Sequence, residues 1–252
     1  MLYLRSALFA GIMFIGTVLY AVICLVFFSF LPFRQRFPAV VLLNRFLLWS
    51  AKIVCGVRCE IEGLEHLPKS GGYVVVANHQ SEWETFFLQT LISPLSTVLK
   101  KELLKIPFFG WALALLRPIA IDRSERSGAL KQILKQGKAR LKEGVPVLIF
   151  PQGTRVKMGE VGRFNKGGAM LACSAKVPVV TIVHNGASCW PSKSILKYPG
   201  TIRLVIGPLI ETEGRTVDEV HQQSKAWLES TLLNISGKDI NPAQEDTKKA
   251  AQ

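Results

Sequence analysis

The pattern of apolar and charged residues changes about one quarter of the way along the chain. From Ser6 to Phe33 no residue is charged, and Arg5 and Arg34 bracket this run. A helix of that length can cross a hydrocarbon core of about 30 Å. A cleavable signal peptide would have a shorter apolar core ending in small residues, whereas the bulky sequence VICLVFFSFLPF occupies that place. We therefore expect this run to stay in the membrane.

A second apolar stretch, residues 38–57, follows and is interrupted by Arg45 and Lys52. Such a stretch suits a helix that lies at the membrane interface with its basic side chains reaching the head groups, or the return arm of a helical hairpin. A helix buried in the protein core is the alternative. We favour membrane association, and assign residues 1–57 to a membrane-associated helical hairpin.

From Arg58 onward, short β-branched runs alternate with segments of helical period. This order is typical of an α/β fold, and we predict a mixed, largely parallel sheet flanked by helices over residues 58–235. The remaining residues, 236–252, lack apolar anchors and are predicted to be disordered. The predicted strands are 58–63, 72–78, 96–102, 117–123, 145–153, 177–186 and 202–207, and the predicted helices are 83–92, 108–116, 128–144, 166–176 and 217–234.

The formal net charge of +13 is unevenly distributed, because no acidic residue precedes Glu60. A basic chain can bind nucleic acid. Here the basic residues flank apolar stretches, so we expect anionic phospholipids as partners instead and no nucleic acid. The basic excess after the first run predicts that the α/β domain lies on the cytoplasmic side of the cell inner membrane. Five scattered cysteines form no disulfide framework, which suits a reducing compartment.

The segment VVVANHQSEWETF, residues 74–86, ends a predicted buried strand with His79. Reactive groups gather where the strands of open α/β sheets end, and an imidazole there can act as a general base if a carboxylate holds its other nitrogen. Glu84 could be that partner. The alternative is structural, because Ser81 and Glu84 form a capping box for the following helix. The two roles are compatible.

Two more predicted strands end in arginines. In LIFPQGTRV, residues 148–156, Gly153 permits a tight turn from which Thr154 and Arg155 project, and backbone N–H groups beside a guanidinium suit a phosphate or carboxylate. The strand IAIDR ends in Arg123, which the neighbouring Asp122 could simply pair with. Each arginine alone could be an ordinary surface residue. Two arginines and a histidine at three strand ends are not explained by core packing.

Other candidates carry weaker signals. His184 ends a strand and is either structural or part of the site lining, while His66 and His221 receive no role. Cys55 and Cys59 lack further ligands for zinc, and no glycine-rich nucleotide-binding motif follows a strand. The segment 99–111 mixes lysines with bulky apolar residues. It is either the surface start of a helix, a guide for an acyl chain, or a contact with the membrane.

Together these segments resemble the 1-acylglycerol-3-phosphate acyltransferase family, the bacterial phospholipid acyltransferases. NHQSEWE resembles the H-x4-D block of that family, IAIDR its second block, FPQGTR its F-P-E-G-T-R block, and VPVVTIVHNG its fourth block. The blocks occur in the family's order and cover about residues 57–210. Four ordered blocks are far more specific than any one alone.

The resemblance implies that His79 is the general base and Glu84 its acidic partner. Arg123, Gly153, Thr154 and Arg155 would bind the substrate phosphate. The implied reaction moves an acyl group from acyl-CoA or acyl carrier protein to the sn-2 hydroxyl of lysophosphatidic acid and gives phosphatidic acid. It needs no metal and no cofactor besides the acyl donor. The alternatives are another lysolipid or glycerol 3-phosphate as acceptor, or a non-catalytic lipid-binding protein.

The sequence departs from the family pattern at three positions. Glu84 replaces an aspartate, which adds a methylene that a backbone shift or a different rotamer must absorb. Gln152 replaces a glutamate and removes a charge next to Arg155, and Thr181 stands where the fourth block has proline. These departures leave His79 and Arg155 in place, so acyl transfer is still expected and the acceptor is less firmly predicted.

Overall fold

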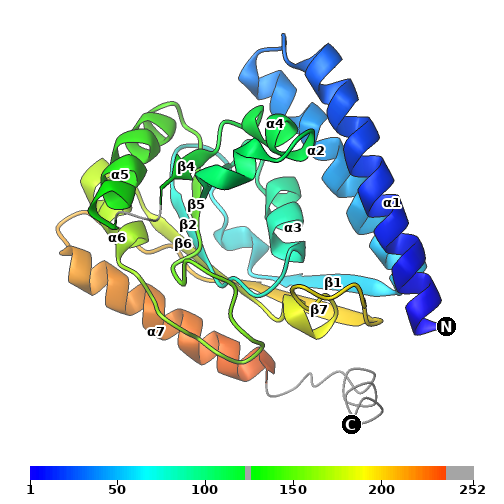
Figure 1. Cartoon of the computed structure of the whole chain (residues 1–252). Helices are drawn as coiled ribbons and strands as arrows, with labels where there is room; N and C mark the ends of the chain where they lie inside the picture. Colours follow the sequence, from blue (N-terminus) through cyan, green and yellow to red (C-terminus); the bar gives the residue numbers. More distant parts are fainter. Residues whose placement is uncertain (123–125, 237–252) are drawn as a thin grey trace.

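The computed structural model describes residues 1–122 and 126–236, which form a seven-stranded sheet with helices on both faces (Figure 1). The strand order is β1-β7-β6-β2-β5-β3-β4. Only β6 and β7 pair antiparallel among these neighbours, and the others pair parallel. The predicted mixed, largely parallel sheet is therefore confirmed. The strands are β1 (Val57–Glu62), β2 (Val74–Ala77), β3 (Ser96–Lys100), β4 (Ile119–Ile121), β5 (Val147–Ile149), β6 (Val179–His184) and β7 (Gly200–Ile206).

The central strand β2 is buried on both faces, which explains its unbroken apolar sequence. Val75 and Ala77 belong to a core shared with the N-terminal helices and α3, whereas Val74 and Val76 belong to a second core shared with α5 and α6. Because successive side chains of a strand point to opposite faces, one short run fills both cores. The helices of this domain are α3 (Trp83–Leu91), α4 (Phe109–Ala114), α5 (Arg126–Lys142), α6 (Gly167–Ala175) and α7 (Val217–Ser236).

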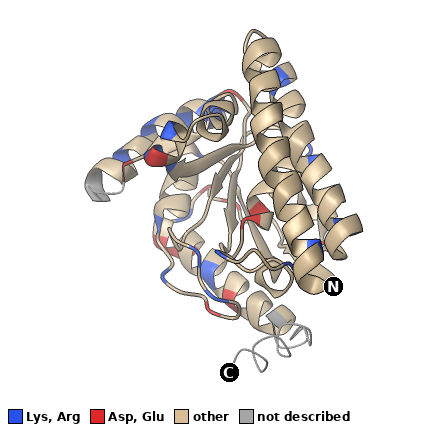
Figure 2. Ribbon diagram, turned by 45° about the vertical axis from the view of Figure 1, so that its right-hand side comes forward, with Lys and Arg blue, Asp and Glu red and all other residues tan. Residues whose placement is uncertain are grey.

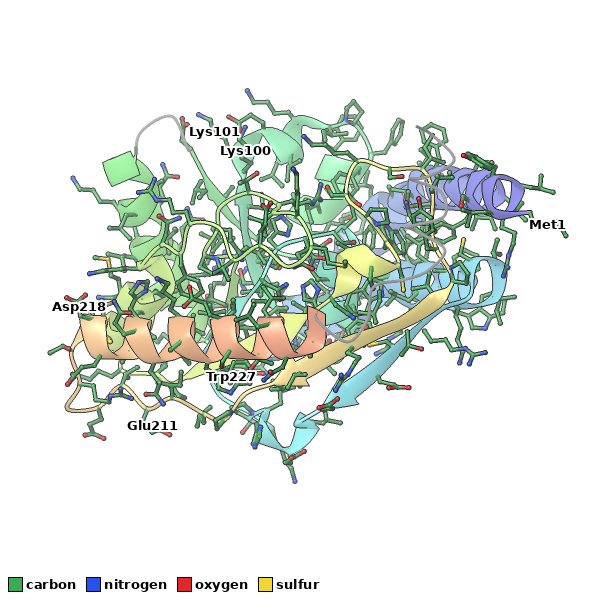
Figure 3. The ribbon with its side chains drawn as sticks, turned by 90° about the horizontal axis from the view of Figure 1, so that it is seen from below. Met1, Lys100, Lys101, Glu211, Asp218 and Trp227 are labelled. Atoms are coloured by element: carbon green, nitrogen blue, oxygen red, sulfur yellow. The ribbon has the colours of Figure 1, made fainter. Side chains whose placement is uncertain are left out.

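Helix α7 closes the described part of the chain and packs against β6. Its buried Leu228 and Leu232 contact Val183 of that strand, and Figure 3 shows the helix from below with Asp218 near its start and Trp227 further along. Ser236 is the last residue of this helix, so the predicted tail does not begin there. The rest of that tail prediction, residues 237–252, lies outside the described residues.

The first 55 residues form a helical hairpin, as the sequence predicted. Helix α1 (Leu2–Ile23) continues as a π-helical turn to Phe28, and α2 (Phe33–Ser50) continues in the same way to Cys55. The chain reverses at Pro32, whose extended backbone precedes α2. The predicted helical hairpin is therefore confirmed, although the first apolar run does not form one helix to its end, because the chain turns over residues 29–32 and α2 begins at Phe33.

The outer face of the hairpin exposes large apolar side chains. Phe14 is 72% and Leu19 61% exposed on α1, and Trp49 is 59% exposed on α2. Figure 2 shows these helices almost wholly in the colour of uncharged residues. Both helices are long and apolar enough to cross a membrane. A contiguous exposed apolar surface of this kind is unfavourable in water, which indicates that the hairpin associates with a membrane.

The inner face of the hairpin is fixed to the α/β domain by specific contacts. The Phe9 ring of α1 meets the Trp190 ring edge to face at 5.1 Å. The buried Asn44 of α2 donates a hydrogen bond to the Gln89 side chain of α3 at 2.9 Å. The hairpin is therefore a wall of the same body that carries the predicted site residues.

Candidate active site

His79 lies two residues beyond the end of β2, and its backbone is held from both sides by the loop that follows β5. Its N–H donates to the Gln152 side-chain oxygen at 3.0 Å. Its carbonyl accepts the N–H of Val156 at 2.9 Å. Because β2 and β5 are neighbouring parallel strands, their carboxyl ends bring these two loops together.

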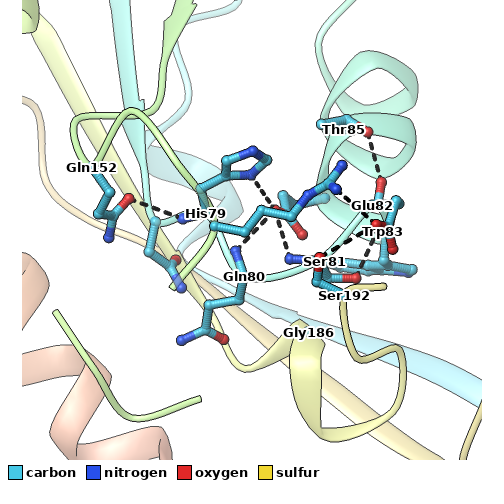
Figure 4. Close-up of polar contacts among 12 residues, drawn as sticks. His79, Gln80, Ser81, Glu82, Trp83, Thr85, Gln152, Gly186 and Ser192 are labelled. Atoms are coloured by element: carbon cyan, nitrogen blue, oxygen red, sulfur yellow. Dashed lines mark hydrogen bonds and ion pairs between the residues drawn. The ribbon is translucent and has the colours of Figure 1, made fainter. Parts of the chain in front are cut away.

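The His79 ring is oriented by a carboxylate and an aromatic ring. Nδ1 lies 2.6 Å from Oε1 of Glu84, a contact drawn as a dashed line from His79 in Figure 4. The ring also stacks on Phe150 with 4.2 Å between centroids. An imidazole that donates from Nδ1 to a carboxylate keeps an unprotonated Nε2 in its neutral form. The side chain is 16% exposed and lines the main cavity. Nε2 can therefore take a proton from a bound molecule.

Glu84 serves at once as the partner of His79 and as a helix cap. It lies in the first turn of α3, is fully buried, and its Oε1 also accepts the backbone N–H groups of Gln80 and Ser81 at 3.1 and 3.0 Å. Ser81 in turn accepts the N–H of Trp83 at 3.0 Å. Glu84 therefore hydrogen-bonds to His79 and completes the capping box at the same time. Its longer side chain, compared with aspartate, reaches the histidine.

The charge of Glu84 follows from its surroundings. Burial raises the pKa of this carboxyl, but the nearby His184 and the hydrogen bonds from His79 and the Ser81 backbone outweigh burial and bring the pKa below its ordinary value. Glu84 is therefore a carboxylate at neutral pH. A fixed anion on Nδ1 favours the imidazolium that a general base forms.

The loop after β5 brings Arg155 to the same place. Gly153 has φ +72°, a left-handed conformation that favours glycine, and its N–H donates to the Phe150 carbonyl at 3.1 Å. Thr154 and Arg155 follow in the lining of the cavity that His79 also lines. The turn predicted from the sequence is thus present, and it brings a guanidinium to the opening beside the histidine.

Arg155 is engaged by a carboxylate that the sequence did not single out. Its Nη1 lies 2.8 Å from Oε1 of Glu82, and Ser192 donates to the same oxygen at 3.4 Å. The side chains of Arg155 and Glu82 are about one third exposed. An anion that enters the site would compete with Glu82 for the guanidinium.

The third predicted strand end is described only in part. Arg123 lies outside the described residues. Its neighbour Asp122 contacts Lys101, which follows β3. The carboxyl ends of β3 and β4 therefore also bring charged residues to this edge of the sheet.

A cavity of about 1060 Å³ connects the histidine to the hairpin. Its lining runs from His79 and Arg155 past Leu113 of α4 to Tyr20 of α1 and Leu43 of α2. Segment 99–111, for which three roles remained open, contributes Lys100, Leu103 and Phe109 to this lining. The histidine and the arginine therefore share one cavity with apolar side chains that suit a hydrocarbon chain, and the amides of Asn44 and Gln89 also line it.

The comparisons with known proteins agree with this geometry. The family model described as Acyltransferase matches residues 58–185. A 1-acyl-sn-glycerol-3-phosphate acyltransferase of Pseudomonas aeruginosa is 46% identical over 92% of both chains. The chain belongs to the acyltransferase family.

More distant relatives extend the same pattern. A 1-acyl-sn-glycerol-3-phosphate acyltransferase of Saccharomyces cerevisiae is 31% identical over 78% of this chain and 66% of its own length. The crystal structure of the 1-acyl-sn-glycerophosphate acyltransferase PlsC from Thermotoga maritima superposes with a TM-score of 0.78 at 26% identity, covering 94% of this chain and 97% of that one. The resemblance drawn from the sequence blocks is confirmed.

The structure accounts for two departures of this acyltransferase from the family pattern. Gln152 uses both ends of its amide, accepting the His79 N–H and donating to the Val161 carbonyl at 3.1 Å. Thr181 forms a hydrogen bond of 2.9 Å with Ser224 of α7, which a proline could not form. The first residue therefore shapes the site, and the second ties a strand to a helix.

Four further residues contribute to the site beyond those that the sequence assigned to it. Phe150 and Gln152 hold His79, and Glu82 holds Arg155. His184 lies behind Glu84, with 4.0 Å between its Nε2 and Oε2 of the carboxylate. The sequence had marked Gln152 as a departure from the family block and His184 as either structural or part of the site lining, whereas Phe150 and Glu82 had received no role. Among the described residues no cluster of three or more potential metal ligands occurs.

Proposed function

We propose that this acyltransferase moves a fatty acyl group from the thioester of acyl-CoA or acyl carrier protein to the sn-2 hydroxyl of 1-acyl-sn-glycerol 3-phosphate, giving phosphatidic acid. The observation that carries the proposal is the hydrogen-bonded His79–Glu84 pair in a largely apolar cavity that Arg155 also lines. The names of the relatives support the same acceptor.

The residues suit direct transfer with His79 as the base. The acceptor hydroxyl oxygen attacks the thioester carbonyl carbon while Nε2 of His79 takes the hydroxyl proton. Glu84 stabilises the imidazolium formed in that step, since its carboxylate already binds Nδ1. When the tetrahedral intermediate collapses, the C–S bond breaks and the imidazolium returns the proton to the leaving thiolate. The ester and a free thiol remain, and His79 is neutral again.

The phosphate of the acceptor requires a cation near the base. Arg155 supplies one, with Gly153 and Thr154 in the same turn, and Arg123 is the second cation that the family resemblance assigns. A phosphate bound to Arg155 would displace or share the Glu82 contact. Because the guanidinium forms paired hydrogen bonds with phosphate oxygens, this exchange favours a doubly charged ligand over a carboxylate.

We assign the protein to the cell inner membrane, with the α/β domain on the cytoplasmic side and membrane phospholipids as its surroundings. The exposed apolar hairpin and its basic flanks support this location. Protease added to the outside of this membrane in cells with a permeabilised outer membrane should leave the domain intact. Cleavage of the domain under those conditions would place it on the opposite side.

The proposed reaction is tested by offering several acceptors to the purified full-length protein with one acyl donor. Lysophosphatidic acid should be acylated faster than lysolipids without a terminal phosphate and faster than glycerol 3-phosphate. Arg155→Ala should remove this preference, and Arg58→Ala, at an exposed position of β1, is the matched control. A preference for an acceptor without phosphate would overturn the role of Arg155 and the proposed acceptor.

A further inference from the structure

The two oxygens of Glu84 have unequal surroundings. Oε1 accepts hydrogen bonds from the His79 ring and from two backbone N–H groups. Oε2 is buried and has no hydrogen-bond partner among the described residues. Burial of a carboxylate oxygen without a hydrogen-bond donor favours the protonated acid. If Glu84 is to remain an anion, a polar group close to Oε2 must counter the increase in pKa that burial causes.

His184 is a buried polar side chain close to that oxygen. It is the last residue of β6, is fully buried, and its Nε2 lies 4.0 Å from Oε2. The Gly186 N–H donates to Nδ1 at 3.1 Å, so Nδ1 carries no proton. The proton of the neutral ring is therefore on Nε2, the nitrogen that faces both the Asn78 carbonyl, at 2.9 Å, and Oε2 of Glu84.

Asn78 fixes the position of this ring. Its side-chain amide donates to the His184 carbonyl at 2.8 Å and accepts the His184 N–H at 2.9 Å. Together with the Nε2 contact, these bonds tie the end of β6 to the residue that precedes His79. A Cβ atom on Gly186 would lie 3.0 Å from Nδ1, so the ring has little room on its other side. His184 therefore holds one orientation relative to Glu84.

We propose that His184 is a positioning residue for acyl transfer. Its neutral Nε2–H, anchored by Asn78, faces the inner oxygen of Glu84 and keeps that carboxylate ionised and aligned on His79. This inference rests on the proposed function for its effect on turnover, but the effect on Glu84 is independent of the substrate.

The neutrality of His184 is part of the arrangement. Burial lowers its pKa below the ordinary value, against the opposing influences of Glu84 and the Asn78 carbonyl, while His79 lowers it further. The ionisable groups acting on Glu84 are His184 and His79. A permanent cation at position 184 would compensate the negative charge of Glu84. The imidazolium of His79 would then be stabilised less. An apolar side chain would remove the N–H group that lies 4.0 Å from Oε2.

Infrared difference spectroscopy of the full-length protein tests the effect on Glu84 directly. The C=O stretch of a protonated carboxyl is followed against pH and assigned to Glu84 by its loss in Glu84→Gln. In His184→Leu this band should appear at a pH about one unit higher than in the wild type or more. His184→Gln, which keeps a neutral donor, should remain close to the wild type. His221→Leu, which removes another buried histidine, is the matched control and should leave the band unchanged.

Turnover provides the second readout. His184→Leu should move the acid limb of the kcat–pH profile to higher pH and recover part of its activity in alkaline buffer. A purely structural role would lower kcat equally at every pH, and that result, or an unmoved Glu84 band in folded His184→Leu, would overturn the inference. If the band moves but the wild type acylates no lysolipid, the proposed function fails while the effect of His184 on Glu84 stands.

Discussion

Glu84 accepts a hydrogen bond from His79 at 2.6 Å with the same oxygen that caps the helix on which Glu84 lies. The helix start and the orientation of the base therefore depend on one atom. A shift of α3 would move the carboxylate, and a rotation of the imidazole would leave a buried anion with fewer donors. This coupling holds the proposed base in one position before any substrate arrives.

Substitution of Glu84 separates its two roles. Glu84→Gln keeps an oxygen that can accept the backbone N–H of Ser81, so the loss of capping free energy should stay within about 1 kcal/mol. It removes the charge that stabilises the imidazolium, so kcat should fall by about 10²–10⁴-fold. The kcat of Glu84→Asp should lie between that of the wild type and that of Glu84→Gln. Steady-state kinetics and denaturant unfolding measure the two effects, and a Glu84→Gln enzyme with wild-type kcat would reduce Glu84 to a helix cap.

The lowered pKa of Glu84 predicts how stability depends on pH. The folded protein holds this carboxylate ionised more strongly than the unfolded chain, so the contribution is complete above the unfolded pKa of about 4.3 and is lost as the pH falls through the lower folded value. The difference in unfolding free energy between the wild type and Glu84→Gln should be constant from pH 7 to about pH 5 and shrink below about pH 4. A difference that grows on acidification would contradict the ionised state of Glu84.

Glu82 should act against acceptor binding. Glu82→Gln frees the Arg155 guanidinium, and because a partly exposed ion pair contributes up to about 1 kcal/mol, KM for lysophosphatidic acid should fall by up to about fivefold with kcat little changed. Initial-rate measurements at several acceptor concentrations check this. Glu60→Gln, at another exposed position, is the control for the change in net charge. In the Arg155→Ala background, Glu82→Gln should no longer lower KM. A decrease in KM that persists in the double variant would mean that Glu82 does not act through Arg155.

Gln152 should be sensitive even to an isosteric change. Gln152→Glu keeps an acceptor for the His79 N–H but, when ionised, loses the donor to the buried Val161 carbonyl, which should cost about 1–3 kcal/mol of unfolding free energy. Gln152→Ala removes both bonds and should be at least as destabilised. Denaturant unfolding at neutral pH measures both variants. Equal stability of wild type and Gln152→Glu would show that the contact with Val161 is not important for folding.

The sequence predicted the sheet because its strands carry local signals. The run from Val74 to Ala77 has no polar position and is bounded by turn residues, and it became the central strand. The capping box of Ser81 and Glu84 is also local, so the start of α3 was predictable. Strand ends lie together in a parallel sheet, which explains why His79 and Arg155 could be assigned to one site in advance.

The remaining features depend on contacts between distant residues. Glu82 and Arg155 are far apart in the chain, and neither has a periodic pattern that identifies the other as its partner. The Asn78–His184 pair joins the ends of two strands in the same way. The hairpin itself was predicted, but the exact position of its turn before Phe33 was not, because the surrounding residues are uniformly apolar. Each of these features could be located only from the three-dimensional structure, because residue type alone does not identify the contacting partner or the turn position.

The central claim is that His79 is the base for acyl transfer, and the acylation of lysophosphatidic acid by His79→Ala tests it most directly. His66→Ala, which removes an exposed histidine outside the site, is measured beside it. We predict that kcat of His79→Ala falls by about 10²–10⁴-fold while the protein remains folded and His66→Ala keeps wild-type turnover. A folded His79→Ala enzyme with the turnover of the wild type would contradict the account.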